Sequence, residues 1–385
     1  MAFVVRGGAC VIEYGMSPRD HRIDFLRGLA LLMIFIDHVP ADILSLITLR
    51  SYAFADAAEL FFFISGYIAA LVYGGVLRRR GFAAAALRIY RRGAQIYAAQ
   101  IVLLVLLVIG VALAGVALDR PWLLDHFGLE TFAAHPGPTL IPALLLRYQP
   151  TYLDILPVYV VLFAILPFLL ALLARDLWRT LGLSFALYLG VQVWGWSPHT
   201  YPDGGVWYFN PFAWQFLFVL GAAFTRPELL RLRALLQSRR FLVPALIAVS
   251  VIAVLSFSAA LHGFFGTVPS LYVFDLPAVK ASLQPLRIVS FLLLAALGWR
   301  FLPDGERLHR HAAARAVMNC GRHALVIFAA GVLLAAVGEI CWQVAPSYGL
   351  QALIGAGGTG LLLALAALLR HLATQRRLQA ASARI

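Results

Sequence analysis

Residues 101–116 read Ile-Val-Leu-Leu-Val-Leu-Leu-Val-Ile-Gly-Val-Ala-Leu-Ala-Gly-Val, within an uncharged stretch that extends from residue 93 to residue 116. A helix needs about 20 apolar residues to cross the roughly 30 Å hydrocarbon core of a bilayer. The sequence therefore predicts an all-α polytopic bundle of about ten transmembrane helices. The predicted spans lie near residues 24–47, 57–77, 93–116, 152–174, 180–195, 210–225, 241–261, 286–301, 324–344 and 350–370.

Composition excludes the other fold classes. The chain is 62% hydrophobic and 13% charged, whereas soluble domains have about 25% charged residues. Disorder requires low hydrophobicity, and an outer-membrane barrel shows alternating rather than continuous apolar runs. We therefore expect one domain in the bacterial inner membrane at residues 24–370, with cytoplasmic tails at 1–23 and 371–385.

Basic residues are distributed unevenly between the two predicted sides. The chain has 31 Lys and Arg and 18 Asp and Glu, which give a net charge of +13. If the N-terminus is cytoplasmic, 26 of the 31 basic residues fall on the inner side. The positive-inside rule then predicts that both termini are cytoplasmic. It also identifies the lipid bilayer, and not nucleic acid, as the partner of this charge.

The first predicted span contains ionisable side chains, which are costly in a bilayer and mark functional sites. Arg27 and His38 are 11 residues apart, or about three helical turns, so they share a face. Asp24 lies one turn before Arg27 and can pair with it, whereas Asp37 points about 100° away from His38. A neutral imidazole can accept a proton near pH 7. We predict His38 as a general base, with Arg27 and Asp24 in the catalytic set.

Two carboxylates open the second predicted span. Asp56 and Glu59 lie one turn apart at its outer end. They can interact with the positive end of the helix dipole. Alternatively, a carboxylate here orients His38 or binds an acceptor hydroxyl. We include Glu59 among the catalytic candidates and Asp56 among the substrate-binding candidates.

A basic inner loop is predicted at residues 78–92. Anchoring to the membrane surface accounts for much of its charge. Arg88 and Arg91, however, lie one turn apart and can direct two guanidinium groups at one anion, for which phosphate is the natural ligand. They are predicted to bind a phosphorylated substrate.

Polar side chains collect at the predicted outer ends of later spans. Asp154 lies in an apolar segment, where a lone carboxylate is costly, so a cationic partner is expected from Lys280 or Arg287. No metal-ligand spacing occurs, and we expect neither a metal site nor a tightly bound cofactor. The predicted substrate-binding residues on this side are Asp56, Tyr152, Asp154, Asn210, Trp214, Lys280 and Arg287.

These motifs together resemble the OpgC family over residues 19 to 345. Four segments show the resemblance. The first begins Arg-Ile-Asp-Phe-Leu-Arg-Gly and extends to His38, and the others are Asp-Ala-Ala-Glu-Leu-Phe-Phe-Phe-Ile-Ser-Gly, Gln-Pro-Thr-Tyr-Leu-Asp-Ile-Leu-Pro and Asn-Pro-Phe-Ala-Trp-Gln. OpgC proteins are similar to the acyltransferase-3 superfamily of ten-span enzymes. Its Arg-(ten residues)-His motif matches Arg27 and His38, and its Arg-x-x-Arg motif matches Arg88 and Arg91. Glu59 departs from the Asp that many members carry.

The resemblance implies an O-acyltransferase that succinylates osmoregulated periplasmic glucans. Cytoplasmic succinyl-CoA would be the donor, with its phosphates on Arg88 and Arg91. His38 would deprotonate a glucan hydroxyl, and transfer would be either direct or through an acyl-histidine intermediate.

Two other classes of protein compete with this interpretation. A transporter or flippase of an acylated or anionic substrate would also bury ionisable residues. No inverted repeat is visible, because the charged first three spans have no counterpart among the last five, and this favours the enzyme. A structural scaffold explains neither the shared face of Arg27 and His38 nor the buried acids.

Overall fold

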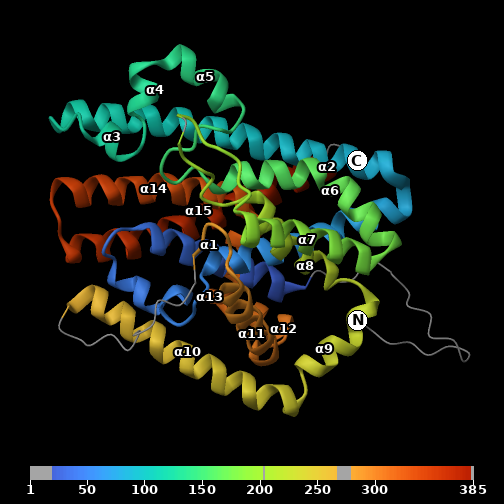
Figure 1. Cartoon of the computed structure of the whole chain (residues 1–385). Coiled ribbons are helices and arrows are strands. Elements are labelled where there is room, and N and C mark those ends of the chain that lie inside the picture. The colour runs from blue at the N-terminus through green and yellow to red at the C-terminus, as the bar shows by residue number, and fades with distance from the viewer. Residues whose placement is uncertain (1–19, 203, 267–278, 383–385) are drawn as a thin grey trace, which may run out of the picture.

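The computed structural model describes residues 20–202, 204–266 and 279–382, and within them it contains helices and no β-strand (Figure 1). The predicted all-α fold is therefore confirmed. The long helices are α1 (His21–His38), α2 (Ala57–Ala117), α6 (Ile155–Arg175), α7 (Leu177–Trp194), α8 (Pro211–Ala223), α10 (Arg239–Phe265), α11 (Pro285–Phe301), α14 (Ala324–Val344) and α15 (Tyr348–Ser382).

Shorter helices connect them. They are η1 (Ile43–Ile47), η2 (Leu49–Ser51), α3 (Leu123–His126), α4 (Glu130–Ala134), α5 (Pro136–Leu144), η3 (Pro227–Leu229), α9 (Leu230–Leu236), α12 (Gly305–Arg310) and α13 (Ala312–Arg322).

Several helices are long and apolar enough to cross a membrane. Among the described residues these are α2, α6, α10, α14 and the Tyr348–Arg376 part of α15. The protein is accordingly a membrane protein. The count of about ten spans, the cytoplasmic position of both termini and the division into tails and domain stay predictions, and most of the N-terminal tail lies outside the described residues.

The expected loop at residues 78–92 is much shorter in the structure. The predicted spans 57–77 and 93–116 belong to two helical limbs of α2, which meet at a kink at Gly81 (φ 79°, ψ 178°). A glycine has no Cβ and adopts positive φ at little cost. The limb after Gly81 runs along the top of Figure 1 to α3. Arg88 and Arg91 consequently lie on a helix.

The first predicted span is too long, because α1 ends at His38 and not at residue 47. Val39 is extended (φ −81°, ψ 116°). It precedes Pro40, and the ring of a proline disfavours helical geometry in the residue before it. The chain then forms the short turns η1 and η2. This early end places His38 at a helix terminus, beside the loop that follows it.

Close packing of α1 against α13 fixes the position of this terminus. A Cβ atom added to Gly28 would lie 1.9 Å from the carbonyl oxygen of Val317, and one added to Gly321 would lie 2.0 Å from that of Asp24. Small residues of this kind let membrane helices approach closely. Any larger side chain at Gly28 or Gly321 would push the two helices apart.

Candidate active site

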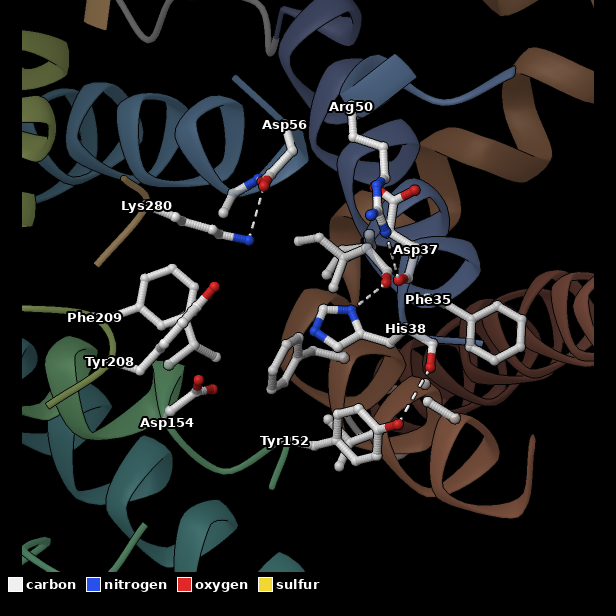
Figure 2. Close-up of a pocket in the computed structure, with 18 of the residues that line it drawn as sticks. Phe35, Asp37, His38, Arg50, Asp56, Tyr152, Asp154, Tyr208, Phe209 and Lys280 are labelled. Atoms are coloured by element: carbon white, nitrogen blue, oxygen red, sulfur yellow. Dashed lines mark hydrogen bonds and ion pairs between the residues drawn. The ribbon is translucent and has the colours of Figure 1, made fainter. Parts of the chain in front are cut away.

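A cavity of about 450 Å³ surrounds the C-terminal end of α1 (Figure 2). Its walls come from α1, the segment before α2, the loops before α6, α8 and α11, and α14. Residues distant in sequence thus meet at one place. The polar and aromatic lining includes Asp37, His38, Arg50, Asp56, Tyr152, Asp154, Tyr208, Phe209, Lys280 and Arg287.

His38 has one ring nitrogen engaged and the other available. Its Nδ1 atom lies 2.6 Å from the carbonyl oxygen of Ile34. Because a carbonyl oxygen only accepts hydrogen bonds, Nδ1 carries the proton and Nε2 has the free lone pair. In Figure 2 the second ring nitrogen points toward the side of the cavity that holds Asp154, Tyr208 and Lys280. The arrangement suits a proton acceptor.

Asp37 also lines the cavity, although it was not among the predicted site residues. Thr48 donates a hydrogen bond from Oγ1 to Asp37 Oδ1 at 2.6 Å, and Arg50 donates from Nη1 to the Asp37 carbonyl oxygen at 3.2 Å. Thr48 and Arg50 come from the loop that follows α1, so this loop holds Asp37 at the edge of the cavity. The structure adds Asp37 and Arg50 to the site.

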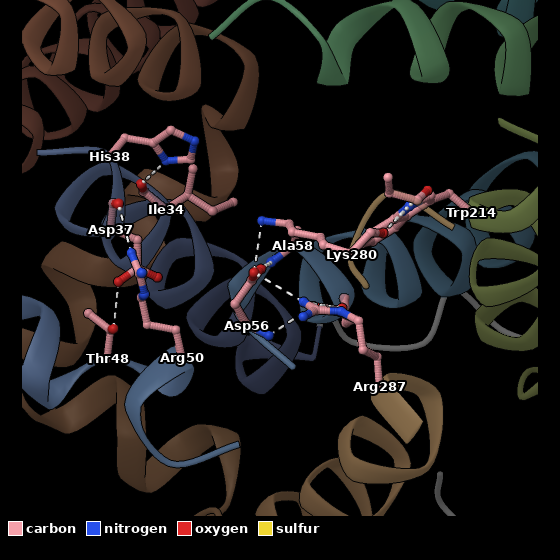
Figure 3. A network of polar contacts seen from close by, with 12 residues as sticks. Ile34, Asp37, His38, Thr48, Arg50, Asp56, Ala58, Trp214, Lys280 and Arg287 are labelled. Carbon is pink, nitrogen blue, oxygen red and sulfur yellow. Dashed lines mark hydrogen bonds and ion pairs between the residues drawn. The ribbon is translucent and has the colours of Figure 1, made fainter. Parts of the chain in front are cut away.

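Two buried carboxylates hold the two cations of the α11 region (Figure 3). Asp56 Oδ2 lies 2.8 Å from Lys280 Nζ and 3.2 Å from Arg287 Nη2, and Glu59 Oε1 lies 2.7 Å from Arg287 Nη2. Lys280 therefore pairs with Asp56, and Arg287 pairs with both Asp56 and Glu59, so the expected ion pair of either cation with Asp154 is not formed in the described structure. Glu59 is fully buried.

These carboxylates also cap α2. The Asp56 side chain accepts a hydrogen bond from the backbone N–H of Ala58, and the Glu59 side chain accepts one from the backbone N–H of Asp56. The helix-terminus interpretation of the acidic pair is therefore confirmed, and Asp56 also lines the cavity, while a role in orienting His38 or binding an acceptor hydroxyl stays a prediction. Burial of the Lys280 ammonium group acts to lower its pKa, but the carboxylates of Asp56 and Glu59 outweigh burial and raise it. Lys280 stays cationic.

A second set of hydrogen bonds contacts the backbone of His38. Tyr152 donates from its hydroxyl to Glu339 Oε2 at 3.0 Å, and this hydroxyl also lies 3.3 Å from the carbonyl oxygen of His38. The other Glu339 oxygen accepts a hydrogen bond from Nε2 of His126 at 2.6 Å. Glu339 thus joins α3, α14 and the loop before α6. The sequence analysis missed it, although an isolated carboxylate in the apolar span 324–344 was a signal that could have identified it.

Asn210 and Trp214 lie behind the cavity wall. Trp214 donates from Nε1 to the carbonyl oxygen of Lys280 at 3.2 Å, and the backbone N–H of Asn210 donates to the carbonyl oxygen of Ala281 at 3.2 Å. Both residues are buried. Their contacts position the backbone that carries Lys280.

The other candidates lie outside the cavity lining. Asp24 pairs with Arg322, whose Nε lies 3.2 Å from Asp24 Oδ2, while the Arg27 guanidinium lies 5.7 Å from the centre of the Phe61 ring. The structure therefore does not bring these two residues to His38.

Arg88 and Arg91 are also distant from the cavity lining. Both are exposed on the second limb of α2. Among the described residues, no group of three His, Cys, Asp or Glu side chains could hold a metal ion.

Comparison with known families identifies one family that covers most of the chain. The sequence profile of the family described as OpgC protein matches residues 19–374. The chain belongs to the OpgC family. Neither curated protein sequences nor solved structures gave a significant match. The resemblance noted from the motifs is thus confirmed, and membership of the OpgC family indicates an acyltransferase-type enzyme that acts on glucans.

Proposed function

We propose that this OpgC protein transfers a succinyl group from cytoplasmic succinyl-CoA to a hydroxyl of a periplasmic glucan, in the bacterial inner membrane. The observation that carries the proposal is the orientation of His38. Its Nδ1 is hydrogen-bonded to the carbonyl oxygen of Ile34, and its Nε2 faces a polar cavity. A base with a fixed tautomer beside a cavity for two substrates is what acyl transfer to a hydroxyl requires.

The proposed reaction uses His38 as base and then as acid. Nε2 takes the proton of the acceptor hydroxyl while the hydroxyl oxygen attacks the carbonyl carbon of the thioester. The carbon–sulfur bond then breaks, and the coenzyme A thiolate receives the proton from the imidazolium. The products are a glucan ester and free coenzyme A, and His38 returns to its neutral form.

Arg50 is a candidate partner for the carboxylate of a succinyl group. It lines the cavity, and its hydrogen bond to the Asp37 carbonyl oxygen uses Nη1. A guanidinium group has five N–H donors, so further donors remain for a carboxylate. Lys280 contributes positive charge on the opposite side of the cavity, although Asp56 neutralises this charge in part.

The donor would approach from the cytoplasmic side. Under the proposal, Arg88 and Arg91 bind the phosphates of coenzyme A, which their exposure and one-turn spacing permit. Arg27, about three turns before His38, and Asp24, about one turn earlier still, would line the path of the thioester arm. Asp56 and Asp154 would contact the acceptor hydroxyls, Tyr152 would hold the end of α1 in place through its contacts with Glu339 and the His38 backbone, and Glu59 would act through Asp56 and Arg287.

One assay tests this function. Purified protein in lipid nanodiscs is given succinyl-CoA with and without periplasmic glucan, and free thiol and the mass of the glucan are measured. The proposal expects glucan-dependent release of thiol and a succinyl mass added to the glucan. Thiol release without modified glucan, or movement of substrate across the bilayer without thiol release, would contradict it and favour a hydrolase or a transporter.

A further inference from the structure

A second cavity of about 450 Å³ lies among three connecting segments. The segments are the region of α3 and α4, the stretch before α6 and the loop between α7 and α8. None of its lining residues belongs to the first cavity. The side chains that the argument uses are Asp125, Glu130, Gln149, Thr151, Thr200 and Tyr201.

Two segments of the chain lie between the two cavities. Thr151 lines the second cavity, and the next residue, Tyr152, lines the first. Likewise, Val206 lines the second, and Tyr208 lines the first. Since consecutive Cα atoms are about 3.8 Å apart, two separate segments place the cavities side by side. A ligand long enough to cross these two segments would contact both cavities.

Hydrogen bonds tie the three walls together. Tyr148 donates from its hydroxyl to the carbonyl oxygen of Gly128 at 2.6 Å. The backbone N–H of Thr151 donates to the carbonyl oxygen of Phe127 at 3.1 Å, and that of Tyr201 donates to the carbonyl oxygen of Arg147 at 2.9 Å. These bonds link each wall to its neighbour, so the cavity is preformed.

The lining suits a ligand with many hydroxyl groups. Gln149 donates from Nε2 to the carbonyl oxygen of Leu146, but its buried Oε1 atom accepts no hydrogen bond within the described structure. A buried acceptor without a donor is costly, and a ligand hydroxyl would satisfy it. Asp125 and Glu130 add carboxylate acceptors, which bind hydroxyl groups and repel phosphates. The aromatic ring of Tyr201 can pack on the apolar face of a sugar.

We propose that the second cavity is a remote acceptor subsite, which binds one glycosyl unit of a glucan while another unit presents its hydroxyl to His38. This inference rests on the proposed function and deepens it. The preferred acceptor is accordingly an oligosaccharide that spans both cavities, and a single sugar is a poor substrate.

The test compares a linear glucan oligosaccharide with methyl glucoside as acceptors. The variants are Asp125→Asn and Glu130→Gln, which preserve shape, with Asp119→Asn as the matched control outside the cavity. Each variant should raise the KM for the oligosaccharide by roughly 10-fold or more, the effect of one hydrogen bond to a charged group. The kcat, and the KM for methyl glucoside, should stay unchanged. Equal effects on both acceptors, or no effect on either, would overturn the subsite.

Equilibrium binding separates this inference from the proposed function. Calorimetric titration of the oligosaccharide into His38→Gln protein should show near-normal affinity, because the glutamine amide can still bond to the acceptor hydroxyl and the second cavity is unchanged. The same titration into Asp125→Asn protein should show weaker binding. If wild-type protein binds the oligosaccharide with this pattern but transfers no acyl group, the function fails and the subsite stands. If transfer occurs and Asp125→Asn binds normally, the subsite fails and the function stands.

Discussion

The imidazole of His38 is tied to the carbonyl oxygen of Ile34, one turn earlier in α1, by a 2.6 Å hydrogen bond from Nδ1. The bond fixes both the tautomer and the plane of the ring. Since α1 ends at His38, the other face of the ring is open to the loops that bring in Tyr152 and Lys280. The base His38 is thus positioned by its own helix, and the side chains that would contact the substrates come from other segments.

Tyr152 and Glu339 should act as positioning residues. Tyr152→Phe removes the hydroxyl that contacts both Glu339 and the His38 carbonyl oxygen, and Glu339→Gln weakens the bond to His126. We expect each to lower kcat by roughly 10-fold, the equivalent of one hydrogen bond, with little change in KM. Steady-state kinetics with both substrates would measure this. A rise in KM alone would show instead that Tyr152 contacts a substrate.

The Asp56–Lys280 pair should be energetically coupled. Asp56→Asn and Lys280→Met each break a charge-assisted contact of 2.8 Å between half-buried groups. Each should lower the free energy of unfolding by roughly 1.5–3 kcal/mol. The double variant should lose less than the sum of the two. Thermal unfolding in detergent would measure all three variants, and strictly additive losses would count against the pair.

The contribution of Lys280 should be constant across neutral pH. Asp56 and Glu59 raise its pKa above the usual 10.5 despite burial. A group whose pKa is raised on folding stabilises the protein fully below its unfolded pKa, and the stabilisation is lost as pH rises through the folded value. The difference in melting temperature between wild type and Lys280→Met should thus stay level from about pH 6 to about pH 9. A steady decline over that range would contradict the assignment.

Arg88 and Arg91 should determine affinity for the donor. Each Arg→Ala change removes a charge-assisted contact, so the KM for succinyl-CoA should rise by roughly 10- to 100-fold. Arg80→Ala removes an exposed arginine just before Gly81 and is the matched control. Kinetics at saturating glucan would compare the three. An equal rise in Arg80→Ala would mean that the basic residues act only as a membrane anchor.

Topology can be tested by single cysteines in a background without Cys10, Cys320 and Cys341. Gln237→Cys and Gln379→Cys lie at exposed positions and should react only with a membrane-permeant thiol reagent. His135→Cys should also react with an impermeant reagent added outside intact spheroplasts, because the charge distribution assigns its segment to the outer side. Labelling of Gln379→Cys by the impermeant reagent would refute a cytoplasmic C-terminus.

The sequence predicted the helical membrane fold because apolar run length and flanking charge are local properties. It also predicted six residues of the cavity lining, since ionisable groups in apolar segments are costly wherever the chain goes. Those residues are His38, Asp56, Tyr152, Asp154, Lys280 and Arg287.

Pairing between distant segments was harder to predict. Asp56 and Lys280 are separated by more than two hundred residues, and no periodicity indicates that they meet. The end of α1 depended on Pro40, whose effect the apolar run concealed, so the following loop, which brings Arg50 to the cavity, was missed. Gly81 lies in a run of helix-forming residues, so the continuation of α2 through the basic segment was missed.

The most direct test of the central claim is acyl transfer by His38 variants. His38→Asn retains an amide that can donate to the Ile34 carbonyl oxygen but lacks an acceptor at the Nε2 position, and His38→Gln places a non-basic amide there. Succinylation of glucan by purified protein in nanodiscs would be measured by mass, with His371→Gln as an exposed histidine control. We predict a fall in rate of roughly 10²–10⁴ in both variants and none in the control. Near-normal succinylation by either His38 variant would contradict the assignment of His38 as the base.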